Sequence, residues 1–181
     1  MKILKKPSIG VFCSAKNNIP NDFLNFAYKF GSFLGKNNFK TVYGGGNQGM
    51  MKKLAEGVCS EKGDILGIIT LEFIKREGNF ENLNDKIICE SLDERKKLLI
   101  SHSDVLCVLP GGFGSLDELF TAIQFNNLNS PRKTLIIVDY LNFYAPLLNW
   151  LEDISNINII EKPANHFCIA RSLHDIEKLL L

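Results

Sequence analysis

The sequence predicts an open, mostly parallel, doubly wound α/β fold in a single domain that spans residues 1–181. Three observations predict it. Short apolar runs alternate with segments of helical periodicity along the whole chain. The apolar runs are continuous, which is typical of strands covered by helices on both faces of a sheet. The length suffices for one substantial core, and the chain has no repeat, low-complexity tract or linker.

The first part of the chain alternates three strands with two helices and then becomes irregular. The first helix has an apolar stripe with helical spacing that includes Phe23, Phe30 and Leu34. Residues 71–84 are polar and without a period, so they predict the longest loop, of a kind that is often functional or mobile. The expected elements are a strand at 9–13, a helix from 21 to 36, a strand at 41–43, a helix from 50 to about 63, and a strand at 65–70.

The second part of the chain continues the alternation to its end. Asn129-Ser-Pro131 ends one helix, and Pro146 lies in the first turn of the next, where proline is tolerated. The expected elements are a strand at 86–89, a helix from 91, a strand at 105–109, a helix at 115–128, a strand at 134–138, a helix at 143–153, a strand at 166–170 and a helix at 173–181.

Composition excludes several classes of function. The formal net charge of +1 does not predict binding to nucleic acid or to a membrane. No segment resembles a signal peptide or a transmembrane span, so we expect a cytoplasmic protein. Three histidines and five cysteines show no metal-ligand spacing, so we expect no metal site. Four cysteines lie in or beside apolar strands, where we expect buried, reduced core residues: Cys13, Cys89, Cys107 and Cys168.

The first glycine motif is GGGNQG at 44–49, between a strand and a helix. Its glycines allow a phosphate to approach the backbone, and a helix N-terminus favours an anion. Two other interpretations stay open. One is a tight turn, and the other is a dinucleotide fingerprint with Glu72 as its acidic residue. The motif follows the second strand instead of the first, which weakens the dinucleotide interpretation.

The second glycine motif, PGGFGS at 110–115, also lies between a strand and a helix and also predicts a phosphate site. Ser115 and Glu118 together match a capping box, which would only stabilise the helix start. Alternatively, a nucleotide phosphate lies on the glycines while the ribose reaches the Glu118 carboxylate, which then stabilises an oxocarbenium-like transition state or orients water. Both interpretations fit this stretch.

A cluster of charges at 93–97 begins a further helix. Such a cluster is usually a solvated face, and Glu94 with Lys97 fits an ordinary ion pair between helical neighbours. Arg95 is equally suited to clamp a phosphate with two hydrogen bonds. The residues alone leave both open.

Taken together, these stretches resemble the LOG family of cytokinin riboside 5′-monophosphate phosphoribohydrolases, also described as possible lysine decarboxylases. The family's PGGxGTxxE appears as PGGFGSLDE at 110–118, and VYGGGxxGLM appears as VYGGGNQGMM at 42–51. The Arg-Lys helix appears as LDERKKLL at 92–99. No lysine context indicates the pyridoxal Schiff base of a decarboxylase.

The resemblance implies a modified Rossmann fold, no metal or organic cofactor, and a homodimer that acts on a small-molecule nucleotide. The implied reaction converts a purine nucleoside 5′-monophosphate, which is N6-modified in cytokinin precursors, to free base and ribose 5-phosphate. A non-catalytic carrier of a nucleotide or of molybdenum cofactor, with the same fold, is the alternative. Asp93, Phe125 and Asn127 replace the family's His, Trp and Gln, and these departures leave the base preference open.

The resemblance also assigns site residues. The implied catalytic pair is Arg95 and Glu118. The implied phosphate contacts are Gly45, Gly46, Gly112, Gly114 and Ser115. Further candidates for substrate binding are Ser14, Lys96, Gly111 and Asp117.

Overall fold

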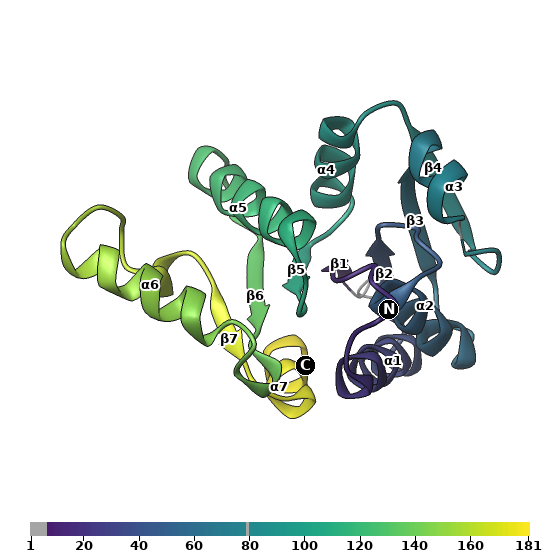
Figure 1. Ribbon diagram of the computed structural model, residues 1–181, viewed down its shortest axis with the longest axis horizontal. Helices are drawn as coiled ribbons and strands as arrows, with labels where there is room; N and C mark the ends of the chain where they lie inside the picture. Colours follow the sequence, from purple (N-terminus) through teal and green to yellow (C-terminus); the bar gives the residue numbers. More distant parts are fainter. Residues whose placement is uncertain (1–6, 79) are drawn as a thin grey trace, which may run out of the picture.

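The computed structural model describes residues 7–78 and 80–181, which form one seven-stranded parallel sheet with helices on both faces (Figure 1). The strand order is β4-β3-β2-β1-β5-β6-β7. The strands are β1 (Ser8–Phe12), β2 (Lys40–Tyr43), β3 (Ile65–Thr70), β4 (Asp85–Cys89), β5 (Val105–Val108), β6 (Thr134–Val138) and β7 (Cys168–Ala170). The predicted doubly wound α/β fold is therefore confirmed.

The described residues form seven α-helices and two short 3-10 helices between and after these strands. The helices are α1 (Asn21–Lys36), α2 (Gly49–Ser60), α3 (Leu71–Glu77), α4 (Leu92–Ser101), α5 (Phe113–Leu128), α6 (Ala145–Asn156) and α7 (Leu173–Leu180). The turns are η1 (Tyr140–Asn142) and η2 (Pro163–Asn165). Within the described ranges, no helix has both the length and the apolar character needed to cross a membrane.

The strand order reverses at β1, which pairs with β2 on one side and with β5 on the other. Phe12 lies opposite Val108, so the carboxyl ends of β1 and β5 are adjacent. The loops that follow them meet directly, because the Ser14 N–H donates a hydrogen bond to the Pro110 carbonyl over 3.2 Å. Open α/β sheets bind ligands in the crevice outside the carboxyl ends of the strands at such a switch point, where the strand order reverses.

Alternation of side chains along each strand supplies a core on each face of the sheet. Val42 packs with Leu99 of α4, whereas Tyr43, its neighbour in β2, packs with α1 and α2 on the opposite face. Helices therefore cover both faces of the sheet and exclude water from them, which explains why the strand sequences are continuous apolar runs.

The structure corrects the prediction that residues 71–84 form a loop, because residues 71–77 form α3. The Thr70 hydroxyl caps this helix by accepting a hydrogen bond from the Phe73 N–H over 3.3 Å. Seven residues are too few for a helical period to stand out, so the sequence pattern missed the helix. Residue 79, in the same stretch, and residues 1–6 of the predicted domain lie outside the described residues.

A second correction concerns the cysteines. Cys13, Cys89 and Cys107 are buried as predicted, but Cys168 is exposed. It belongs to β7, a three-residue strand at the edge of the sheet, with only β6 as its neighbour. An apolar run predicts a strand but does not reveal whether both sides of that strand are covered.

Candidate active site

The N-terminus of α5 is open to an anion. Gly112 is the N-cap residue and provides no side-chain cap, and the Leu116 N–H makes the first intrahelical bond, to the Gly112 carbonyl at 3.0 Å. Within the described part of the chain, the N–H groups of Phe113, Gly114 and Ser115 have no hydrogen-bond partner. Unpaired N–H groups and the positive end of the helix dipole attract negative charge, so this terminus is suited to a phosphate.

The N-terminus of α2 is closed by comparison. The Gly49 N–H donates to Asn17 Oδ1, and the Met50 N–H donates to the Ser14 carbonyl, both over 2.9 Å. Because the β1–α1 loop already satisfies these groups, the first glycine motif does not offer them to a phosphate. Glu72, the acidic residue of the dinucleotide interpretation, also does not line the cavity described next. The structure therefore argues against that interpretation.

A cavity of about 310 Å³ lies above the carboxyl ends of β1, β2, β3 and β5. Seven of the eleven predicted site residues line it: Ser14, Gly46, Arg95, Gly112, Gly114, Ser115 and Glu118. The other four do not: Gly45, Lys96, Gly111 and Asp117. The structure thus brings together residues that are more than 100 positions apart in the sequence, from Ser14 to Glu118.

Arg95 is buried, with a side chain only 9% exposed, and it is held by three hydrogen bonds. Its Nε donates to the Ile68 carbonyl (2.9 Å), its Nη2 to the Gly44 carbonyl (3.1 Å) and its Nη1 to Glu118 Oε1 (3.2 Å). A Cβ atom on Gly44 would collide with Nη2, so glycine is required there by the close approach of the guanidinium. The first glycine motif therefore supports Arg95.

Glu118 is equally buried, and burial raises its pKa to about 7. The Arg95 charge and hydrogen bond oppose this rise, while the nearby Asp117 charge adds to it. A carboxyl group with this pKa exchanges its proton near neutral pH, which suits a general acid or base. Its bond to Arg95 also corrects the capping-box interpretation, because Ser115 lies inside α5 and the N-cap is Gly112.

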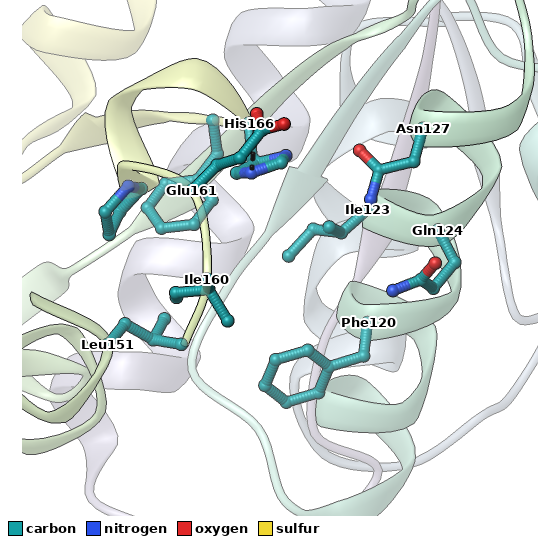
Figure 2. Close-up of a pocket in the computed structure, with 10 residues that line it drawn as sticks. Phe120, Ile123, Gln124, Asn127, Leu151, Ile160, Glu161 and His166 are labelled. Carbon is teal, nitrogen blue, oxygen red and sulfur yellow. Dashed lines mark ion pairs between the residues drawn. The ribbon is translucent and has the colours of Figure 1, made fainter. Parts of the chain in front are cut away.

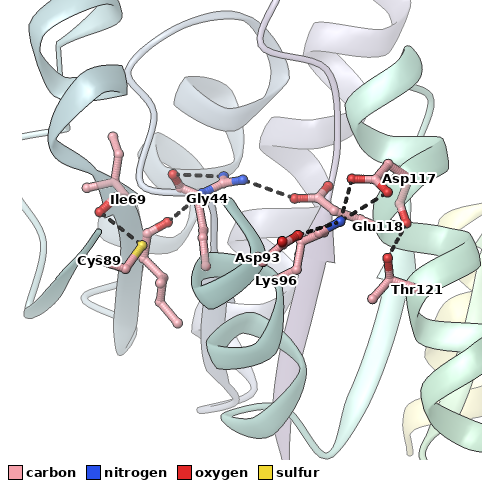
Figure 3. Close-up of polar contacts among 10 residues, drawn as sticks. Gly44, Ile69, Cys89, Asp93, Lys96, Asp117, Glu118 and Thr121 are labelled. Carbon is pink, nitrogen blue, oxygen red and sulfur yellow. Dashed lines mark hydrogen bonds and ion pairs between the residues drawn. The ribbon is translucent and has the colours of Figure 1, made fainter. Parts of the chain in front are cut away.

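A second, more exposed ion pair runs beside the buried one. Lys96 Nζ donates to both carboxylate oxygens of Asp117, at 3.1 and 2.9 Å, and also lies 3.4 Å from Asp93 (Figure 3). Together the two ion pairs join α4 to α5. Lys96 and Asp117 thus lie behind the cavity wall, where their charges act on Glu118.

Sequence reasoning missed several cavity residues. Phe73 and Arg76 come from α3, and Lys16 comes from the β1–α1 loop. One signal for a functional role of α3 was its position. This helix directly follows β3, so it begins at the carboxyl ends of the strands, where the glycine motifs also lie. Thr70 was the local signal, since threonine is a common N-cap residue.

A second hollow, of about 260 Å³, separates α5 from α6 and the η2 segment (Figure 2). It is mainly apolar, with Phe120 and Ile123 on one side and Leu151 on the other. The pair His166 and Glu161 at its edge is 3.8 Å apart. Asn127, one of the departures from the family pattern, lines this hollow and not the cavity that contains Arg95.

Comparison with known proteins places this geometry in a family. Residues 51–180 match the family described as "Possible lysine decarboxylase". The chain belongs to this family, the LOG family. Among curated LOG proteins, it is 26% identical over 162 residues to cytokinin riboside 5′-monophosphate phosphoribohydrolase LOG1 of Arabidopsis thaliana, covering 90% of this chain and 76% of LOG1. It is 27% identical to the phosphoribohydrolase of Rhodococcoides fascians, covering 80% and 74%.

Solved structures share the fold of this LOG-family chain. The molybdenum cofactor binding protein of Rippkaea orientalis matches with a TM-score of 0.72 and 23% identity, covering 97% of this chain and 96% of that one. The molybdenum cofactor carrier protein of Chlamydomonas reinhardtii matches with a TM-score of 0.75 and 17% identity, covering 96% and 95%. At these identities the likeness establishes the fold alone.

A matched pair of glycine variants separates packing from ligand access. A Cβ at Gly114 meets no atom within 4 Å, so Gly114→Ala should leave the melting temperature near wild type and weaken phosphate binding about tenfold by intruding on the anion. Gly44→Ala should instead destabilise the fold by about 2 kcal/mol, because it displaces a buried arginine from its carbonyl partner. Thermal denaturation and calorimetric phosphate titration measure both. Equal melting temperatures for the two variants would contradict the role of Gly44.

The two members of the exposed ion pair, Lys96 and Asp117, should shift the pKa of Glu118 in opposite directions. The Lys96 charge lowers the pKa of Glu118 and the Asp117 charge raises it. We therefore expect Lys96→Met to raise the pKa of Glu118 and Asp117→Asn to lower it, as followed by carbon NMR of the labelled carboxyl group. Shifts of the same sign in both variants would show that the effect comes from loosened packing and not from charge.

Proposed function

We propose that the protein hydrolyses the N-glycosidic bond of a purine nucleoside 5′-monophosphate and releases the free base and ribose 5-phosphate. One observation carries the proposal: Glu118, with a pKa of about 7, lies one helical turn from the open N-terminus of α5 and faces the same cavity. Family membership and the names of the curated relatives support this reaction class.

We propose that one ribose phosphate spans from the first turn of α5 to the Glu118 carboxyl group. In the proposed complex, the phosphate accepts hydrogen bonds from the N–H groups of residues 113–115. Ser115 and Glu118 are three residues apart on one helix and therefore lie on the same face. Both side chains line the cavity. A phosphate on the first turn thus directs the sugar of the same nucleotide toward the carboxyl group on the next turn.

Glu118 is the group that acts on the sugar. As the bond from C1′ to the base breaks, positive charge develops on the ribose, and a nearby carboxylate stabilises it. The same carboxylate accepts a proton from the attacking water as the water oxygen bonds to C1′ and the C1′–N bond breaks. The departing base takes up a proton from solvent, and Glu118 returns its proton to solvent, so water is split between the sugar and the base. Ionised Glu118 is the reactive form in this scheme.

Arg95 has donors left for the substrate. An arginine side chain has five N–H groups, and three of them bind Ile68, Gly44 and Glu118. One N–H remains on each Nη atom, at the wall of the cavity. We propose that these groups bind ribose or phosphate oxygens and hold the substrate over Glu118.

Direct assay of base release tests the proposal and its alternative. Purified protein is incubated with AMP, an N6-prenylated AMP, GMP and a pyrimidine monophosphate, and free base is quantified by chromatography. We expect release from a purine substrate, and preference for the prenylated substrate would assign the cytokinin-type activity of the curated relatives. Tight retention of an intact phosphate ligand without turnover would instead favour the carrier alternative.

Glu118→Gln should remove turnover and keep binding. Glutamine has nearly the same shape but neither carries a negative charge nor accepts a proton, so we expect kcat to fall by about 10²- to 10⁴-fold. The affinity for ribose 5-phosphate should stay within about threefold, because the α5 N-terminus is unchanged. Glu152→Gln, on the exposed face of α6, is the matched control. Wild-type turnover in Glu118→Gln would leave this carboxyl group without a catalytic role.

The pH profile should follow the ionisation of Glu118. Because its pKa is raised to about 7, the carboxyl group is protonated below neutral pH and ionised above it. We expect kcat/KM to fall about tenfold for each pH unit below 7 and to level off above 7. Residual activity of Glu118→Gln should lack this limb. A wild-type profile that is flat from pH 5 to 7 would contradict the assignment.

The protein is also proposed to act as a homodimer, as the family resemblance implies. Large apolar side chains are exposed on α5 and α6 and in the segment after α6, including Leu128, Trp150 and Ile159. Such surface favours association. Sedimentation equilibrium would then give twice the mass of the 20.4 kDa chain.

A further inference from the structure

The ring of Phe73 contacts two guanidinium groups at the wall of the cavity. The Cζ atom of Arg95 lies over the ring at 5.6 Å from its centroid, and that of Arg76 lies over it at 4.6 Å. Both distances fall within the range in which an aromatic ring attracts a cation. Phe73 is half-buried and lines the same cavity as Arg95 and Glu118.

The hydrogen bonds of Arg95 do little to restrain motion of the guanidinium perpendicular to its own plane. The N–H groups of a guanidinium lie in its plane, so bonds to Ile68, Gly44 and Glu118 restrain the group within that plane. They restrain displacement perpendicular to the plane less well. An aromatic ring packed against the guanidinium supplies contact that these in-plane bonds do not.

The same stretch of chain holds Arg95 from both directions. Ile68 accepts a hydrogen bond from Arg95 Nε near the end of β3, and Thr70 then caps α3 by binding the Phe73 N–H. Only four residues lie between Ile68, whose carbonyl helps to fix the plane of the guanidinium, and Phe73, whose ring contacts it. We propose that Phe73 is a positioning residue that holds Arg95 against Glu118. The catalytic consequence of this rests on the proposed function, but the positioning itself does not.

The first experiment needs no activity. The titration of Glu118 is followed by carbon NMR of its labelled carboxyl group in Phe73→Leu, which keeps apolar bulk, and in Phe73→Tyr, which keeps the ring. Loss of the ring should loosen Arg95 and raise the midpoint of the Glu118 titration by about half a pH unit, whereas the tyrosine variant should match wild type. Phe73→Met is a second ring-free variant if the leucine variant folds poorly.

Other charged and titratable groups near Glu118 are unchanged in these variants, which makes the comparison specific. They directly follow β1, belong to α4 or α5, precede α6, or line the cavity: Cys13, Lys16, Arg76, Arg95, Lys96, Asp117 and Tyr144. Arg76 also contacts the ring, so Arg76→Met is measured in parallel. A midpoint shift in Arg76→Met as large as that in Phe73→Leu would assign the effect to the Arg76 charge and overturn the proposal.

The second experiment is kinetic. In Phe73→Leu, kcat should fall about three- to tenfold with little change in KM, and Phe73→Tyr should restore it. An unchanged Glu118 midpoint in both ring-free variants overturns the positioning role, whatever the rates. If the Glu118 midpoint shifts in the ring-free variants but the wild-type protein releases no base, the positioning role is confirmed and the proposed function is refuted. The experiments can therefore refute the positioning role of Phe73 and the proposed hydrolysis independently of each other.

Discussion

The buried ion pair between Arg95 and Glu118 is the interaction on which the candidate site depends. Both side chains are at most 9% exposed, and a buried charge is strongly unfavourable unless it is paired and hydrogen-bonded. Arg95 meets this requirement through two main-chain carbonyls and one carboxylate, which come from the ends of β2 and β3 and from α5. Removing either partner leaves the other buried without its partner at the carboxyl ends of the strands. The same ion pair therefore stabilises both the site and the local fold.

The two glycine motifs have different physical roles around this pair. At 44–49, glycine lets the backbone approach the Arg95 guanidinium, and the adjacent helix terminus is closed by Asn17 and Ser14. At 110–115, Gly112 and Gly114 have open space beside them at the start of α5, where the first N–H groups of the described helix are unpaired. One motif therefore holds a cation of the protein, and the other is suited to an anion of the ligand. This division favours a ligand with one phosphate group over a dinucleotide.

Much of this arrangement could be predicted from the sequence. Continuous apolar strands alternating with helices predicted the fold. The resemblance to the LOG family, carried by the two glycine motifs and the Arg-Lys helix, assigned Ser14, Arg95 and Glu118 to one site, and all three line one cavity. The sequence could not decide between capping and chemistry for Glu118, because a serine and a glutamate three residues apart serve both. The outcome depends on Arg95, which is 23 residues away in the sequence and bonds to Glu118 only in the folded sheet.

The incorrect predictions for residues 71–84 and for Cys168 share a cause. α3 is short and is fixed mainly by one threonine cap and its position above the sheet edge, so the pattern of residues 71–84 did not reveal it or the placement of Phe73. Cys168 was expected in the core because its neighbours are apolar. Both edge strands carry a cysteine, but Cys89 on β4 is buried and Cys168 on β7 is exposed, so the packing around each strand decides the outcome. In both cases the deciding information lies in the tertiary structure. Local periodicity does not contain it.

The charges around the cavity bear on how Glu118 would act on the proposed phosphate-bearing substrate. A phosphate at the α5 N-terminus adds negative charge about one turn from Glu118, which by itself would favour the protonated carboxyl group. Behind the cavity wall, Lys96 and Asp117 add opposite charges near Glu118. Among the described lining residues, Lys16, Arg76 and Arg95 are cationic, and Glu118 is the only acidic side chain. These cations offset the phosphate charge and keep the carboxylate accessible near neutral pH. The fold is shared with solved molybdenum cofactor binding and carrier proteins. The balance of charge around the buried Glu118 is the feature on which the proposed hydrolysis depends.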